Sequence, residues 1–240
     1  MVKASGVAVT GFLPSACAFQ FTNSFPRQPV LVVSVPGIGD VPIGDASNGL
    51  CGGMVFAVRD LHEAGVSPPS TRIPPERDTP LYKYIVRRLF DSFDLPGGVA
   101  RYLQYMTAPD ADTDLGMFTR RGIAHATIVD EWPRIRYDLD RGILCPLGVV
   151  TVHSLDPRML GRNHQVLAYG YTMSGTRLRI NVYDPNTPPE DADDVYIELD
   201  LSHPRRVTPV AHTISIGTLP VRGFFRESYR FTDPRTALAA

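Results

Sequence analysis

The residue best suited to covalent chemistry is Cys51, which lies where a loop becomes a predicted helix. At a helix start, free backbone N–H groups and the positive end of the helix dipole favour the thiolate form of a cysteine. Gly52 and Gly53 follow it, and because glycine is a poor helix former, they predict that another group approaches the backbone closely. The sequence therefore indicates Cys51 as a nucleophile, while Cys17 and Cys145 are expected to be inert thiols.

A histidine and an aspartate follow, near the far ends of two alternating runs at residues 163–171 and 176–184. The residues between the runs predict a β-hairpin with a three-residue loop at 173–175. If the strands pair so that opposed residue numbers sum to 348, His164 lies directly opposite Asp184, with Cβ atoms about 4.5–5.5 Å apart. A carboxylate at this distance fixes the tautomer of a catalytic histidine and stabilises its charged form. The alternative is a structural ion pair at the end of a strand.

The elements that must position these residues are predicted in the order helices first, strands second. Apolar residues recur at helical spacing in residues 51–141 and alternate in residues 144–232. This order is typical of α+β proteins with segregated layers. The expected helices cover residues 51–63 and 99–106, a segment that begins with Thr79 as N-cap and Pro80, and a segment that carries Ile128, Trp132, Ile135 and Leu139. The expected strands cover residues 147–153, 163–172, 176–184, 195–201 and 223–231.

The start of the fourth helix has two candidate positions. Thr127 and Asp130 fit the two positions of a capping box. Pro133 would distort a helix that began there, which moves the expected start toward Asp130.

Charge and composition argue against several function classes. The 240-residue chain carries 24 Lys plus Arg against 25 Asp plus Glu, a net charge of -1, which argues against nucleic acid or an acidic membrane as a partner. It contains no apolar run of about 18 residues, the length that a membrane helix needs. The histidines lack metal-ligand spacing and residues 37–44 match no phosphate-binding loop, so neither a metal nor a cofactor is expected.

The cysteine count bears on the compartment. Three cysteines, an odd number without a Cys-x-x-Cys pair, predict at least one free thiol, which fits a reducing environment. Residues 1–18 faintly resemble a signal peptide, but Ser5, Gly6 and Pro14 interrupt the apolar centre. A cytoplasmic location is therefore favoured over secretion.

Taken together, the order of cysteine, histidine and aspartate resembles the papain-like cysteine peptidases, and among them the bacterial, bacteriocin-processing-like branch. The matching pieces are residues 49–54 (GLCGGM), 163–171 (NHQVLAYGY) and 182–186 (VYDPN). The resemblance implies a papain-like α+β fold in which residues 1–240 form one domain. Its expected parts are an N-terminal arm (1–48), a helical lobe that carries the cysteine (49–142) and an antiparallel sheet lobe that carries the histidine and aspartate (143–232).

The resemblance also implies roles for the three residues. Cys51 would be the nucleophile, His164 the general base and acid, and Asp184 the group that orients the imidazole. Asn186 is the alternative for the third role, because papain itself uses an asparagine there.

The sequence departs from the family at one position. Papain-like enzymes usually place a glutamine six residues before the nucleophile, where it donates to the oxyanion, and this chain has Asp45 there. An ionised aspartate would repel the developing negative charge. The alternatives are a protonated Asp45, a replacement donor at Asn48 or Ser47, or an oxyanion held by backbone N–H groups alone.

The expected function is hydrolysis of an amide, peptide or related acyl bond through a covalent thioester on Cys51. The expected partner is a peptide or a small acyl or amide substrate, and the oligomeric state stays open. Two alternatives remain: an acyl or amide transferase that uses the same three residues, and a binding module that keeps the fold without turnover.

Overall fold

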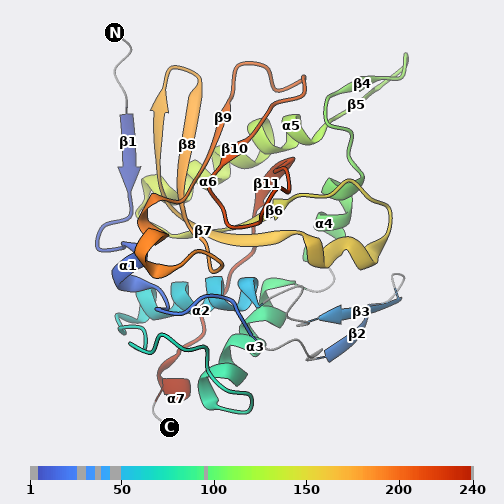
Figure 1. The fold of residues 1–240 in the computed structure, drawn as a ribbon. Helices are drawn as coiled ribbons and strands as arrows, with labels where there is room; N and C mark the ends of the chain where they lie inside the picture. Colours follow the sequence, from blue (N-terminus) through green and yellow to red (C-terminus); the bar gives the residue numbers. More distant parts are fainter. Residues whose placement is uncertain (1–4, 26–30, 36–38, 44–49, 95–96, 239–240) are drawn as a thin grey trace.

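The protein is an α+β structure in which helices pack against a seven-stranded antiparallel sheet (Figure 1). The computed structural model describes residues 5–25, 31–35, 39–43, 50–94 and 97–238. The sheet order is β10 (Ala211–His212), β9 (Tyr196–Asp200), β8 (Arg177–Tyr183), β7 (His164–Ser174), β6 (Cys145–Val150) and β11 (Gly223–Arg226), with β1 (Ser5–Ala8) paired to β7. Two small hairpins join β2 (Leu31–Val35) to β3 (Gly39–Ile43) and β4 (Thr113–Asp114) to β5 (Thr119–Arg120).

The helical elements are mostly short. The α-helices are α1 (Pro14–Cys17), α2 (Cys51–Ala64), α3 (Pro80–Ser92), α4 (Gly97–Thr107), α5 (Ile123–His125), α6 (Trp132–Asp140) and α7 (Arg235–Leu238). A π-helical turn covers Ala126–Glu131, and 3₁₀ turns cover Pro157–Arg162 and Pro189–Asp194. The expectation of an α+β protein is confirmed, and most of the expected helices and strands occur close to their predicted bounds. The last strand is shorter than predicted, because it ends at Arg226 rather than at residue 231.

The helix α2 is the centre of the hydrophobic core. All of its residues from Cys51 to Leu61 are buried, and it packs against both α3 and β7. A Cβ atom added at Gly53 would lie 2.1 Å from the carbonyl oxygen of Ile85 in α3, so only glycine lets the two backbones meet this closely. The helix ends at Gly65, whose φ of 63° is the left-handed conformation that glycine adopts without strain.

The start of α3 follows the expected capping chemistry. Thr79 accepts a hydrogen bond from the backbone N–H of Tyr82, and Pro80 occupies the first turn. A proline there removes no helical hydrogen bond, because the first N–H groups have no partner inside a helix.

The fourth expected helix begins earlier than predicted. It starts at Ile123, and the N–H of Trp132 donates to the carbonyl of Thr127, five residues back, in the π-helical turn. Pro133 explains the irregularity, because it lacks an N–H and its ring crowds the preceding turn. The hydroxyl of Thr127 is bonded to the backbone of Phe224 in β11, so the capping box was a wrong prediction.

The predicted register of the β7–β8 hairpin was also wrong. The turn has two residues, and Leu167 faces Tyr183 rather than Asn181, with a bulge between Ala168 and Gly170. The prediction relied on separating a polar from an apolar face, but β7 is buried throughout its first eight residues, so neither face is free to be polar.

The first strand of the N-terminal arm, β1, is part of the seven-stranded sheet. Residues of β1 pair with Gly170–Met173 of β7, and β6 pairs with residues 164–168 of the same strand. The strands β6 and β1 therefore share one edge of β7. The bulge between Ala168 and Gly170 lies at the level where β1 replaces β6 as the partner on that edge.

A buried ion pair fastens the C-terminal segment to the helices. Asp60 of α2 lies 2.7 Å from the guanidinium of Arg88 in α3, and both side chains are almost fully buried. The Asp60 carboxylate also accepts hydrogen bonds from Tyr84, from Tyr229 and from the backbone of Thr232. Each lone pair that burial removes from water is thereby used, as a buried charge requires.

We expect Asp60→Asn to lower the free energy of unfolding by at most about 3–5 kcal/mol, because it removes the buried partner of Arg88 and leaves that guanidinium only the half-exposed carboxylate of Asp91. The control is Arg158→Ala, which breaks the exposed pair between Arg158 and Asp156 and should leave stability unchanged. Urea denaturation of both variants makes the measurement. Equal midpoints for the two variants would show that the buried pair contributes no more than a surface one.

Candidate active site

The nucleophile candidate, Cys51, is the first residue of α2 and is only 7% exposed. Its thiol is within hydrogen-bonding reach of the His164 side chain, at the start of β7. The structure therefore brings together a helix N-terminus and a strand that are more than a hundred residues apart in sequence. The positive end of the helix dipole and the imidazole both act on this thiol.

The other side of the imidazole is held by Asp184. The Nε2 atom of His164 lies 2.7 Å from Oδ1 of Asp184, and the aspartate is fully buried. Asp184 follows the last paired residue of β8, so the two are offset rather than directly opposed, and the long imidazole spans the offset. Asp184 thus engages Nε2, which leaves Nδ1 as the ring nitrogen available to a further partner.

The Asp184 carboxylate is saturated with donors. Besides His164, it accepts bonds from the hydroxyl of Thr187 and from the backbone N–H groups of Asn186 and Ser215, at 2.7–2.9 Å. Four donors on two oxygens fix the orientation of the carboxylate and, through it, the ring of His164.

The electrostatics favour a charged imidazole. Burial works to raise the pKa of Asp184, but the charge of His164 and the hydrogen bonds that the carboxylate accepts hold that pKa below its ordinary value. Burial works to lower the pKa of His164, but the charges of Asp184 and Cys51 raise it to about 10. His164 therefore carries its proton at neutral pH and places a positive charge beside the thiol.

The glycine after the cysteine lets α2 reach this position. A Cβ atom at Gly52 would lie 2.2 Å from Oε1 of Gln165 in β7 and 2.4 Å from Oγ of Ser92 in α3. Any larger residue would push the helix start away from the strand that carries His164. The close approach that the two glycines predicted is confirmed.

A buried polar cluster of Gln165, Glu227 and Tyr102 lies beside the cysteine and was missed from the sequence. Gln165 donates to the carboxyl of Glu227 at 3.4 Å, and Tyr102 is hydrogen-bonded to the same carboxyl. Burial raises the pKa of Tyr102 well above its ordinary value, and the charges of Glu227 and Cys51 add to this effect. The three residues come from β7, the segment after β11, and α4, so no local spacing could have joined them.

Glu227 is held in its neutral form. It is 2% exposed, and burial raises its pKa to about 8, with hydrogen bonding to Tyr102 and the charge of Arg101 opposing only part of the effect. Gly148 makes the room for this carboxyl, since a Cβ atom there would lie 2.7 Å from Oε1 of Glu227. At neutral pH the cluster therefore adds no full negative charge next to the thiol.

The remaining predicted site residues divide into two groups. Asp45 and Asn48, with Ser47, lie outside the described residues. Asn186 is described, but its side chain is bonded to Asn23 and to the carbonyl of Ser215, so the partner of His164 is Asp184.

The other two cysteines are placed differently from Cys51. Cys17 is half-buried and its thiol donates to the carbonyl of Gly11. Cys145 is fully buried in β6, and burial raises the pKa of its thiol well above the ordinary value. Neither thiol has an imidazole beside it among the described contacts.

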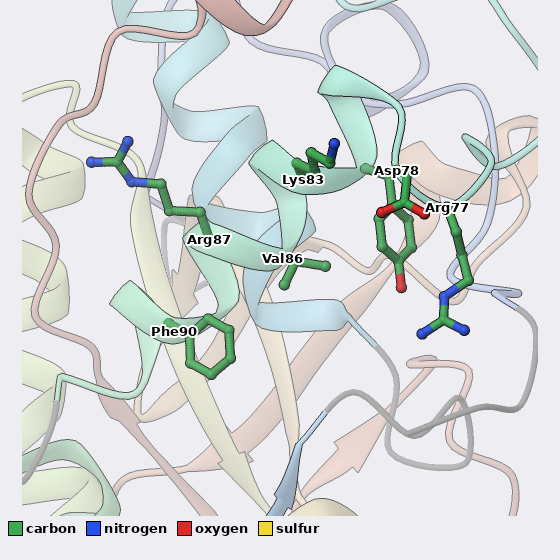
Figure 2. A pocket seen from close by; sticks show the side chains of 7 residues that line it. Arg77, Asp78, Lys83, Val86, Arg87 and Phe90 are labelled. Atoms are coloured by element: carbon green, nitrogen blue, oxygen red, sulfur yellow. The ribbon is translucent and has the colours of Figure 1, made fainter. Parts of the chain in front are cut away.

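Two cavities in the described part of the chain are lined by residues other than Cys51, His164 and Asp184. A pocket of about 490 Å³ lies on the outer face of α3, where Lys83, Val86, Arg87 and Phe90 face it together with Asp78 from the preceding loop (Figure 2). A second cavity of about 240 Å³ is lined by Glu227 and Arg101 among others, and so borders the buried cluster. Within the described part of the chain, no group of three or more His, Cys, Asp or Glu side chains is arranged to hold a metal ion.

We expect Glu227→Gln to change how stability depends on pH. The Glu227 carboxyl binds its proton more tightly in the folded state than in the unfolded state. Its contribution to the free energy of unfolding is therefore fully present below pH about 4.5 and is lost as the pH rises through about 8. The glutamine cannot titrate, so the variant should match the wild type near pH 4.5 and be more stable at pH 8, by a few kcal/mol at most. Urea denaturation at both pH values tests this, and the control is Glu63→Gln, at a partly exposed side chain. A stability difference between Glu227→Gln and the wild type that is the same at both pH values would contradict the prediction.

Comparison of the chain with protein-family models, with curated proteins and with solved structures found no match. None of the helices in the described residues is both long and apolar enough to cross a membrane. The functional argument therefore starts from the geometry of Cys51, His164 and Asp184.

Proposed function

We propose that this protein is a cysteine hydrolase that cleaves an amide, peptide or related acyl bond, with Cys51 as nucleophile, His164 as acid and base, and Asp184 as the orienting group. One observation carries the proposal: a buried imidazole that is bonded to a carboxylate through one nitrogen and lies beside a helix-start thiol. A histidine with this pair of neighbours can both activate a thiol and return a proton.

The arrangement of elements supports a papain-like type of enzyme, near the bacteriocin-processing-like branch. The thiol stands on a central helix, the imidazole stands at the start of β7, and the carboxylate directly follows the neighbouring strand β8 of the antiparallel sheet (Figure 1). The chain order of cysteine, histidine and aspartate agrees with that branch. The fold alone would carry no activity, so the proposal depends on the three side chains.

In the first half of the proposed reaction, the Cys51 thiolate attacks the acyl carbon and forms a carbon–sulfur bond. The protonated His164 gives its Nδ1 proton to the leaving amine, the bond to that amine breaks, and a thioester remains. In the second half, His164 takes a proton from water, whose oxygen attacks the thioester. The carbon–sulfur bond breaks, the acid leaves, and the thiolate and imidazolium are restored. An amine in place of that water would make the same site a transferase.

The oxyanion of each half-reaction needs donors near Cys51. The N–H groups in the first turn of α2 have no carbonyl partner within the helix, and they point toward its N-terminal end. We propose that the backbone N–H of Cys51 is one such donor. Backbone donors of this kind stabilise a tetrahedral intermediate without a charged side chain.

We expect iodoacetamide to alkylate Cys51 at pH 6 at least about tenfold faster in the wild type than in His164→Ala, because the protonated imidazole stabilises the thiolate. Peptide mapping by mass spectrometry separates the three cysteines. Cys17 provides the internal control and should react equally in both proteins, while Cys145 should not react in the folded state. Equal rates at Cys51 in the two proteins would overturn the hydrolase proposal and favour the non-catalytic binding module.

A further inference from the structure

A short segment from the N-terminal arm links the two sides of the candidate site. Asn23 accepts a hydrogen bond from the backbone N–H of Leu50, the residue before Cys51, at 2.8 Å. Its side-chain amide donates to the side-chain oxygen of Asn186 at 3.0 Å, two residues after Asp184. Its own backbone N–H donates to the carbonyl of Pro185 at 2.8 Å. One residue thus bonds both to the start of α2 and to the turn that carries Asp184.

Aromatic side chains on both sides of Asn23 anchor the segment. Phe19 and Phe21 are buried and stack with ring centres 4.9 Å apart. Phe25 is buried too, and its ring meets Phe21 and Tyr82 of α3 edge to face. The segment is therefore fixed to the helical side by apolar packing, which leaves the amide of Asn23 free to reach toward the sheet side.

The structure gives α2 no cap of its own. Leu50 occupies the N-cap position and has no side chain that can accept a hydrogen bond. An asparagine carries an acceptor and a donor at fixed geometry, so Asn23 can hold the Leu50 amide and Asn186 at the same time. A displacement of either end would change the separation of the Cys51 thiol from the imidazole that Asp184 holds.

We propose that Asn23 is a positioning residue for the reaction of Cys51, contributed by the N-terminal arm. It keeps the start of α2 and the Asp184 turn at the separation that the contact between thiol and imidazole requires. This inference rests on the proposed hydrolase function.

The test is the rate of Cys51 alkylation by iodoacetamide between pH 5 and pH 10. We expect Asn23→Ala to lower the rate at pH 6 by about tenfold, the effect of losing one good hydrogen bond to the reacting arrangement. Near pH 10, where His164 loses its proton, the variant and the wild type should converge. A purely structural role would lower the rate equally at every pH or only lower the melting temperature. The control is Thr22→Ala, because within the described part of the chain the Thr22 hydroxyl bonds only to neighbouring Ser24.

The second variant, Asn186→Ala, removes the side-chain bond of Asn23 to the Asp184 turn but keeps its backbone bond to Pro185, so it should slow Cys51 alkylation at pH 6 less than Asn23→Ala does. It serves if Asn23→Ala fails to fold. If Asn186 acts through Asn23, the double variant should have the same rate at pH 6 as Asn23→Ala. A rate for Asn23→Ala equal to that of Thr22→Ala, while His164→Ala is slow, would overturn the role of Asn23 and leave the proposed function standing. An unchanged rate in His164→Ala would overturn both.

Discussion

The need to neutralise buried charge organises this structure. The pair of His164 and Asp184 cannot be taken out of water unless each lone pair and each N–H finds a partner. The turn at residues 184–187 and the segment around Ser215 both fold so that their donors point at one carboxylate. The same requirement recurs near the other end of α2, where Asp60 and Arg88 gather the C-terminal segment around a second buried pair.

Between these two ionic sites, α2 is held by backbone contacts on two sides. Gly52 lies against β7 and Ser92, and Gly53 lies against the backbone of α3. Adjacent glycines thus serve different neighbours, which follows from the roughly 100° turn between successive residues of a helix. The position of the candidate nucleophile depends on contacts that no larger residue could make, and not on the packing of flexible side chains.

Much of the local structure was predictable from sequence. Apolar spacing, Thr79 with Pro80, and the glycine after α2 defined helices closely, because these signals act within a few residues. The register of β7 was not predictable, since a strand buried on both faces carries no alternation that could fix it. The contact of His164 with Asp184 was predicted from a β7–β8 register that does not occur. It forms nevertheless, because the imidazole of His164 spans the offset between the two residues. The bridge through Asn23 and the cluster around Glu227 join distant segments, so no local pattern reveals them.

The way the C-terminal segment binds α2 has a consequence for synthesis of the chain. Cys51 leaves the ribosome before His164, which follows more than a hundred residues later. Tyr229 and Thr232, which hold Asp60, follow later still. The core helix therefore cannot reach its final environment until Thr232 has emerged. Contacts this far apart in sequence slow folding, and they also keep the thiol away from its imidazole while the nascent protein is incomplete.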